Sequence, residues 1–315
     1  MKIWLAPLHG ITYHYFRNCL HRHVNHIDAA MSPFMVPVKS ATVTQKQLFK
    51  SWKDIHPTMQ EGEFSNPKTG KLIPQFMGNQ AEDFVLTAKQ LLQWGYEEMN
   101  WNLGCPASQV VTHKRGCGLM PLPDRVEEVV AAVTGQTSIR FSVKMRLGLK
   151  EQAESEELIR RLNRYPLKEI VIHPRLGVQQ YEGSPDWDAL ERLWAQSLHP
   201  IIYSGDIYSV ADYQEFTARF PQIDQIMLGR GLLANPFLAE EIAQGSPLEH
   251  SLWMERFRNY YEDLCHTLLI QRGEKGALGN LKELWHYFAL SLHLSPEQLT
   301  QLLRIDDFSK FIAFK

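Results

Sequence analysis

The sequence EEMNWNLGCP, residues 97–106, passes from a short strand-like run into a turn that cannot continue a strand. Gly104 permits backbone conformations that other residues avoid, and Pro106 has no N–H to offer a neighbouring strand. The turn therefore presents the Cys105 side chain in a loop directly after a strand. The Asn102 amide can both donate and accept hydrogen bonds, which suits a polar ring edge. A tight turn around a buried, unreactive thiol explains this stretch equally well.

Short apolar or β-branched runs like this one alternate with amphipathic, helix-like segments. Roughly eight runs are present, over residues 3–7, 27–32, 72–77, 97–102, 139–146, 169–173, 200–205 and 223–229. The segments between them include residues 81–94, 123–133, 151–164, 187–194 and 210–220. This alternation predicts an α/β protein built as a (β/α)8 TIM barrel. An open doubly wound sheet is the alternative, but Leu8-His9-Gly10-Ile11 lacks its glycine-rich fingerprint.

Two parts of the chain depart from this alternation. Residues 29–73 form a segment longer than one barrel loop needs, with Lys39, Lys46, Lys50 and Lys53 beside aromatic residues, and we expect it over the barrel mouth. From Gly245 onward only helix-like patterns remain, over residues 252–270, 278–291 and 296–304. We therefore expect a catalytic barrel over residues 1–244 and an all-helical domain over residues 245–315, joined at Gly245-Ser246-Pro247.

Composition and charge restrict the class of protein. The 315 residues include 44% hydrophobic and 22% charged residues, and no apolar run reaches the roughly 18 residues of a membrane span. Pro7 interrupts the N-terminal apolar run too early for a signal peptide, so we expect a cytoplasmic protein. The four cysteines are widely spaced, which argues against disulfides and a metal site. A net charge of −2 means that any contact with RNA depends on local basic clusters.

Unusual polar residues lie at the ends of the predicted strands, where a barrel carries its active site. Lys144 and Arg146 alternate at the end of one strand and therefore share a side, while His173 ends the next. Any one of them alone is more often a structural or solvated group. Together with Asn102 and Cys105 on a neighbouring strand, they indicate one shared site.

The last two strands end in glycine-containing turns, Ser204-Gly205-Asp206 and Gly229-Arg230-Gly231. Such turns after the seventh and eighth strands let backbone N–H groups approach a phosphate, with Arg230 as a further donor. A phosphate-anchored cofactor facing a lysine and a cysteine suits flavin mononucleotide (FMN), with Lys144 stabilising the reduced ring and Gln75 bonding its edge. Cys105 then suits a proton donor to a substrate stacked on the flavin.

These residues occur in motifs that resemble those of the bacterial tRNA-dihydrouridine synthases. The matching segments are Leu5-Ala6-Pro7, residues 74–78, Asn102 to Ala107, residues 115–118, residues 142–148, residues 171–175 and residues 227–231. The resemblance implies a flavoprotein barrel in which NADPH reduces FMN, hydride passes to carbon 6 of a uridine in tRNA, and a cysteine protonates carbon 5. Leu8-His9-Gly10, Leu176 and Ser204 depart from the family's usual Met-Glu-Gly, Thr and Asn.

The resemblance also implies roles for individual residues. Cys105 is the acid, and Asn102, Lys144 and Arg146 bind the uracil. The expected FMN contacts are Ala6, Pro7, Leu8, Gln75, Lys144, His173, Ser204, Gly205, Asp206, Gly229 and Arg230. We expect tRNA backbone contacts from residues 39–53 and from the helical domain, no metal, and a monomer.

Three alternatives remain open from the sequence. A flavin barrel that reduces a free pyrimidine-like molecule shares the flavin residues but leaves the helical domain unexplained. A flavin-free lyase could form a Schiff base on Lys144. A barrel that binds RNA and has lost catalysis would bind tRNA without consuming NADPH.

Overall fold

The computed structural model describes residues 1–56, 64 and 71–313, and its strands form one closed parallel barrel. All strand pairs are parallel, in the order β3-β2-β1-β9-β8-β7-β6-β5-β4. The strands are β1 (Lys2–Leu5), β2 (Ala29–Met31), β3 (Leu72–Ile73), β4 (Gln75–Phe76), β5 (Glu98–Leu103), β6 (Arg140–Arg146), β7 (Ile170–His173), β8 (Ile201–Tyr203) and β9 (Gln225–Leu228).

The nine strands correspond to the eight that the sequence predicts, because Pro74 divides one of them. β3 pairs with β2, and β4 pairs with β5, so residues 72–76 join the two ends of the sheet. Pro74 has no N–H, which breaks the hydrogen-bond ladder at that point, although its carbonyl accepts from Asn100 N at 2.9 Å. The predicted TIM barrel is therefore confirmed.

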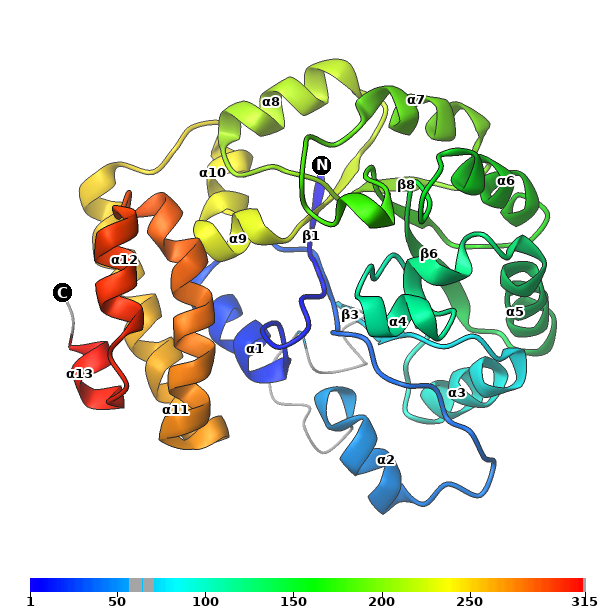
Figure 1. Ribbon diagram of the computed structural model, residues 1–315, viewed down its shortest axis with the longest axis horizontal. Coiled ribbons are helices and arrows are strands. Elements are labelled where there is room, and N and C mark those ends of the chain that lie inside the picture. The colour runs from blue at the N-terminus through cyan, green and yellow to red at the C-terminus, as the bar shows by residue number, and fades with distance from the viewer. Residues whose placement is uncertain (57–63, 65–70, 314–315) are drawn as a thin grey trace.

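Helices surround this barrel and continue beyond it as a C-terminal group (Figure 1). The α-helices are α1 (His14–His23), α2 (Gln45–Ser51), α3 (Ala81–Gln93), α4 (Ser108–Thr112), α5 (Pro123–Gln136), α6 (Ala153–Leu162), α7 (Trp187–Gln196), α8 (Val210–Arg219), α9 (Arg230–Ala234), α10 (Leu238–Gln244), α11 (His250–Ser291), α12 (Pro296–Leu303) and α13 (Phe308–Ile312). The described residues contain no helix long and apolar enough to cross a membrane.

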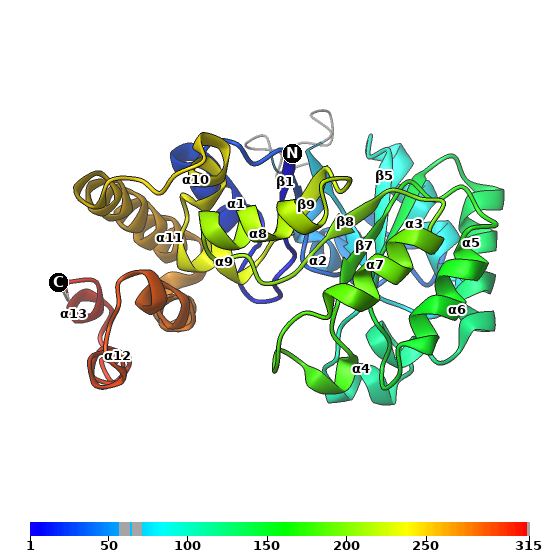
Figure 2. The same ribbon diagram turned by 90° about the horizontal axis from the view of Figure 1, so that it is seen from above.

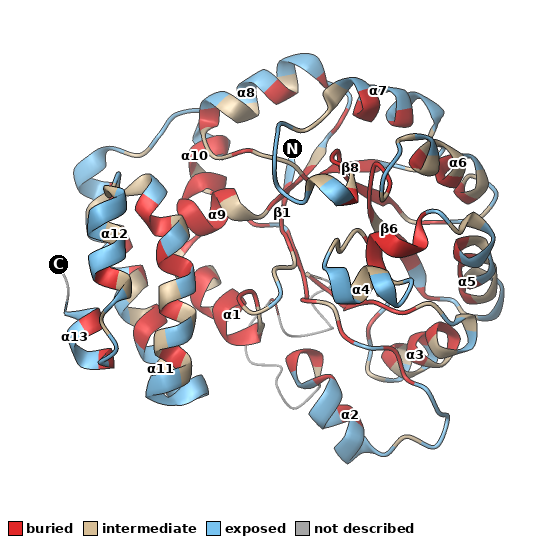
Figure 3. Cartoon of the chain, in the orientation of Figure 1, coloured by how far each residue is buried: buried red, intermediate tan, exposed pale blue. Residues whose placement is uncertain are grey.

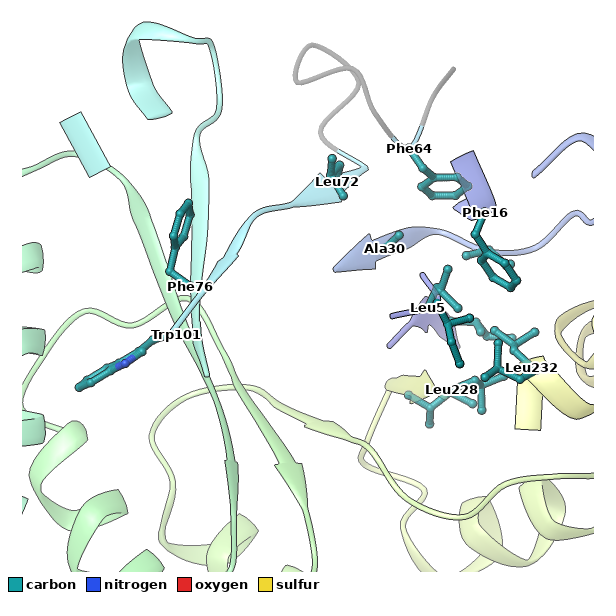
Figure 4. Close-up of a cluster of buried hydrophobic side chains, with 14 of the residues drawn as sticks. Leu5, Phe16, Ala30, Phe64, Leu72, Phe76, Trp101, Leu228 and Leu232 are labelled. Carbon is teal, nitrogen blue, oxygen red and sulfur yellow. The ribbon is translucent and has the colours of Figure 1, made fainter. Parts of the chain in front are cut away.

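Alternating side chains of the strands enter two separate cores. Leu5, Phe76 and Leu228 point outward into the layer beneath the helices, where Phe16 of α1 and Leu232 of α9 also lie (Figure 4). The inward side chains form a smaller apolar cluster of Trp4, Ala6, Ala29, Met31, Ile73, Val171, Ile202 and Met227. This two-sided burial explains why the strands are almost continuously apolar in sequence, and Figure 3 shows them buried beneath helices with exposed outer faces.

The described part of residues 29–73 packs mainly against the side of the barrel. Trp52, which follows α2, is buried with its ring 4.8 Å from that of Phe76 and 5.7 Å from that of Trp94. Because Phe76 points outward, α2 belongs to the outer ring of helices, and the four lysines are exposed there. Phe34, in the same segment, reaches the mouth. Residues 57–63 and 65–70 lie outside the described part.

The C-terminal helices form a group at one side of the barrel (Figure 2). Gly273 has φ 64° and ψ 170°, so α11 consists of two helices joined at a kink, as the two predicted segments indicate. α11 packs against α1 and α9 of the barrel. Gly245, in the left-handed conformation with φ 77°, ends α10 at the predicted linker. The division into domains at this residue stays a prediction.

Candidate active site

Two adjoining cavities open at the carboxyl ends of the strands. The glycine-lined cavity is bordered by Ala6, Pro7, Leu8, Lys144, His173, Tyr181, Ser204, Gly205, Asp206, Tyr208, Gly229, Arg230 and Gly231. The cysteine-lined cavity is bordered by Pro7, Leu8, His9, Ile11, Phe34, Asn102, Gly104, Cys105, Pro106, Lys144, Arg146, His173, Tyr181, Glu283 and Tyr287. Every predicted site residue except Gln75 lines at least one of them. Pro7, Leu8, Lys144, His173 and Tyr181 belong to both cavities and so connect them.

Close packing explains two glycines of the glycine-lined cavity, Gly205 and Gly231. A Cβ at Gly205 would overlap the hydroxyl of Tyr203, and a Cβ at Gly231 would overlap the carbonyl of Ile207. A Cβ at Gly229 would be in ordinary contact with the Ala6 Cβ at 3.4 Å, so packing does not require a glycine there. The backbone therefore borders the cavity directly, as a bound phosphate requires.

Asp206 is held between two arginines at the edge of this cavity. Arg175 NH1 donates to its Oδ1 at 3.1 Å, Arg175 NH2 pairs with Oδ2, and Arg230 NH2 donates to Oδ1 at 2.5 Å. Burial disfavours ionisation of Asp206, but the two guanidinium groups outweigh it and lower the pKa of the carboxyl. Asp206 therefore holds Arg230 in place rather than offering a donor itself.

A hydrogen-bonded amide network lies inside the barrel below the cysteine-lined cavity. Gln75 is fully buried, donates to Asn100 Oδ1 at 2.9 Å, and accepts from Asn102 Nδ2 at 2.9 Å. Asn100 in turn donates to Ser142 Oγ at 2.8 Å. The structure thus places Gln75 behind Asn102 and outside both cavity walls, so its predicted contact with the flavin ring stays a prediction.

Asn102 fixes the loop that carries Cys105. Its Oδ1 accepts from the backbone N–H groups of Gly104 and Cys105, each at 3.0 Å. One amide N–H bonds Gln75, and no other group among the described residues accepts from the second N–H, which can therefore bond a ligand. Arg146 braces the same loop, because its Nε donates to Gly104 O at 2.9 Å and its NH1 to Leu176 O at 3.0 Å.

The segment 115–118 supports Cys105 from behind. Gly116 has φ 52°, and a Cβ there would lie 2.5 Å from Cys105 O and 3.0 Å from Cys105 Cβ. Cys117 donates its backbone N–H to Cys105 O at 3.1 Å. Burial raises the pKa of the Cys117 thiol to about 11, so it stays protonated at neutral pH, whereas Cys105 is half-buried in the cavity wall.

At the junction of the two cavities, Lys144 is cationic and His173 is neutral. Burial, and secondarily Arg146, lowers the pKa of Lys144 to about 8, so at pH 7 it is mostly protonated. No carboxylate among the described residues pairs with its ammonium group. Burial and the nearby cations Lys144, Arg146, Arg175 and Arg230 hold the pKa of His173 well below its usual value. Neutral His173 Nε2 accepts from Arg175 NH1 at 3.0 Å, which leaves Nδ1 as its donor.

Several cavity residues lie outside the strand ends and are not predicted from the sequence. The ring of Tyr181 lies 4.5 Å from the Arg230 guanidinium carbon and 5.5 Å from that of Arg146. Glu283 and Tyr287 come from α11, and Asn280 of the same helix donates to Gly10 O at 2.9 Å. Helical periodicity gives the spacing of these α11 residues, but it does not indicate which part of the barrel they face.

The fold and the arrangement of side chains define an α/β barrel whose mouth holds a glycine-bordered cavity with cationic side chains next to a cysteine-lined cavity. Among solved structures, morphinone reductase has the same fold: one structure has a TM-score of 0.53 at 14% identity and covers 80% of this chain and 88% of that one. A second, in complex with tetrahydroNAD, has a TM-score of 0.52 at 13% identity and covers 80% and 90%. At this identity the likeness concerns the fold alone.

The chain belongs to the dihydrouridine synthase family, whose model matches residues 4–285. It is 26% identical to the tRNA-dihydrouridine(16) synthase of Neisseria meningitidis serogroup B, over 90% of this chain and 84% of that one. The chain is also 26% identical to the tRNA-dihydrouridine(16) synthase of Cupriavidus necator, over 97% of this chain and 95% of that one. The tRNA-dihydrouridine synthase B of Pasteurella multocida is 26% identical over 75% and 67%. The resemblance is thereby confirmed, as is the prediction of a flavin-dependent oxidoreductase.

Proposed function

We propose that this protein uses FMN and NADPH to reduce a uridine of tRNA to 5,6-dihydrouridine. The observation that carries the proposal is the junction of the two cavities, where Lys144 faces both a glycine-bordered anion site and the Cys105 thiol. Relatives named for position 16 of tRNA make uridine 16 the proposed target. Synthase B is not named for that position, so the product must be mapped along the whole tRNA.

The residues of the glycine-lined cavity fit FMN. Lys144 is a half-buried cation without a carboxylate partner among the described residues, so an anionic or electron-rich group would offset the cost of its partial desolvation. His173, Gly205, Gly229 and Arg230 would hold the phosphate, with Ala6, Pro7, Leu8, Ser204 and Asp206 completing the wall. When bound, FMN reduced by NADPH supplies the hydride for carbon 6 of the uracil.

Cys105 supplies the proton. The thiol of Cys105 transfers its proton to carbon 5, which completes the addition of one hydride and one proton across the carbon–carbon double bond. The resulting thiolate then regains a proton from solvent through the open cavity. The two bonds from Asn102 Oδ1 and the brace from Arg146 hold the loop at a fixed position during this transfer. The free N–H of Asn102 and the cationic groups Lys144 and Arg146 bind the polar edge of the uracil.

The macromolecular substrate of the proposed reaction is tRNA. A uridine within folded RNA reaches the cavity only when it is swung out of its stack, so the protein must hold the surrounding RNA. We assign this role to the helical domain over residues 245–315, because its helix α11 forms one wall of the cysteine-lined cavity. Action on tRNA as a cytoplasmic monomer is part of the same proposal.

An anaerobic titration tests the proposal. The protein is loaded with FMN, reduced with NADPH, and mixed with unmodified tRNA, uridine monophosphate or uracil. We expect tRNA to restore the oxidised flavin spectrum and to gain dihydrouridine, and the free pyrimidines to act far more slowly. Equal rates with uridine monophosphate would favour the small-molecule reductase. Binding of tRNA without NADPH consumption would favour the RNA-binding protein, and borohydride trapping of a substrate on Lys144 in a colourless protein would favour the lyase.

A further inference from the structure

An aromatic pair lies at the rim of the cysteine-lined cavity and has no part in the chemistry described above. The His9 ring stacks on Phe34 with a centroid distance of 5.0 Å and an interplanar angle of 22°. His9 is exposed, Phe34 is half-buried, and both line the same cavity as Cys105. The Tyr13 ring is roughly perpendicular to that of His9, with a centroid distance of 6.3 Å and an interplanar angle of 67°. Phe34 covers one face of the imidazole, and the exposed His9 leaves surface for another flat ring.

Glu283 of α11 lies beside this pair. A Cβ built on Gly10, the residue after His9, would lie 3.6 Å from Glu283 Oε2. Glu283 is exposed, and no cation among the described residues forms an ion pair with it. Burial raises the pKa of Tyr287, and the charge of Glu283 raises it further. The Glu283 carboxylate therefore lies near Tyr287, which lines the same cavity. Like charges repel, so this carboxylate disfavours an RNA phosphate and favours a group with N–H donors.

We propose that His9, supported by Phe34, and Glu283 bind the base of a nucleotide next to the target uridine, and that this base carries an amino group. The inference rests on the proposed function. Swinging the uridine into the cavity removes a stacking partner from its neighbours, and an exposed aromatic ring at the rim replaces that partner. The Glu283 carboxylate accepts from the exocyclic amino group of adenine, guanine or cytosine, whereas uracil has no amino group and can offer only its ring N3–H.

The stacking half of the proposal is tested with tRNA that carries 2-aminopurine, a fluorescent base quenched by stacking, on the 5′ or 3′ side of the mapped target uridine. The 2-aminopurine fluorescence of each labelled tRNA is measured with saturating FMN-loaded protein. For one of the two tRNAs, we expect the unmodified protein to quench this fluorescence more strongly than His9→Ala does. With unlabelled tRNA, His9→Ala should lower kcat/KM by roughly tenfold or more. His9→Phe should restore both the quenching and the rate, because it keeps a stacking ring. His286→Ala, an exposed histidine of α11 outside both cavity walls, is the matched control.

The amino-group half is tested by changing the neighbouring base. We expect the unmodified protein to reduce tRNA with adenosine, guanosine or cytidine at that position at least several-fold faster than tRNA with uridine. Glu283→Ala should abolish this preference, whereas Glu274→Ala, an exposed residue of the same helix, should keep it.

Two results overturn the inference and leave the proposed function intact. In the first, His9→Ala forms dihydrouridine at the normal rate and quenches the fluorescence as strongly as the unmodified protein does. In the second, Glu283→Ala keeps the preference for a neighbouring base with an amino group. If the unmodified protein forms no dihydrouridine in any tRNA, the proposed function itself fails.

Discussion

Replacing Gly116 with alanine should displace the Cys105 loop and leave the flavin site unchanged. Gly116 has φ 52°, a left-handed conformation that costs a residue with a Cβ about 1–2 kcal/mol. The new Cβ would lie 2.5 Å from the backbone oxygen of Cys105. Unstrained contacts between heavy atoms lie near 3.5–4.0 Å, so the loop must move by about 1 Å. Gly116 lines neither cavity.

A shift of this size has a large effect on a proton transfer. A misplacement of about 1 Å in a reacting group costs about 100-fold in rate. We therefore expect Gly116→Ala to form dihydrouridine about 100-fold more slowly than the unmodified protein in a single turnover with tRNA. FMN affinity and the rate at which NADPH bleaches the flavin should stay within about twofold, because neither depends on the loop.

Gly135→Ala is the matched control. Gly135 lies in α5, its φ is not left-handed, and a Cβ there meets no atom within 4 Å. Alanine in a helix is about 1 kcal/mol more favourable than glycine, so this variant should be fully active and no less stable. A Gly116→Ala protein that folds and reduces tRNA at the unmodified rate would refute the idea that this glycine positions Cys105.

Three further predictions concern charged groups. Lys144 has a pKa of about 8 in the protein without FMN, so the affinity for FMN should fall between pH 7 and pH 9 as the ammonium group loses its proton. Lys144→Met should bind FMN more weakly at pH 7 and show no such fall. Parallel pH profiles of the two proteins would exclude a role of the Lys144 charge in FMN binding. Arg175→Met frees one side of Asp206, which then competes for the phosphate donors, so we expect at least tenfold weaker FMN binding by fluorescence titration, and unchanged affinity would contradict this. Arg17→Met leaves the buried carboxylate of Asp54 without its ion-pair partner and should lower the free energy of unfolding, measured in urea, by about 3–5 kcal/mol. Adding Asp54→Asn should recover part of this loss. A loss below about 1 kcal/mol in Arg17→Met would contradict the prediction.

The barrel and much of its mouth are predictable from the sequence because strand burial and strand ends leave local signals. Two-sided burial makes the strands apolar, and the polar residues at the end of a run mark where the strand reaches the mouth. Lys144, His173 and Asn102 are found in this way. The division of one strand at Pro74 is compatible with the same pattern, since a proline interrupts the ladder without changing the apolar run.

The remaining site residues depend on contacts between distant segments. Glu283 and Tyr287 lie on a helix whose periodicity gives its buried side but not its partner, and α1 and α9 provide that partner only in three dimensions. Tyr181 lies in a loop with no repeating pattern. Gln75 matches a family motif, yet its amide is already bonded to Asn100 and Asn102, which motif matching does not reveal.

The most direct test of the central claim is the amount of dihydrouridine formed per tRNA in a single turnover by Cys105→Ala and by the unmodified protein, both loaded with FMN and reduced by NADPH. General acids contribute about 10²- to 10⁴-fold, so we predict that the unmodified protein converts its tRNA while the variant, with normal flavin reduction, is at least 100-fold slower. Equal rates would remove Cys105 from the proton transfer, and the absence of dihydrouridine with the unmodified protein would contradict the proposed reaction.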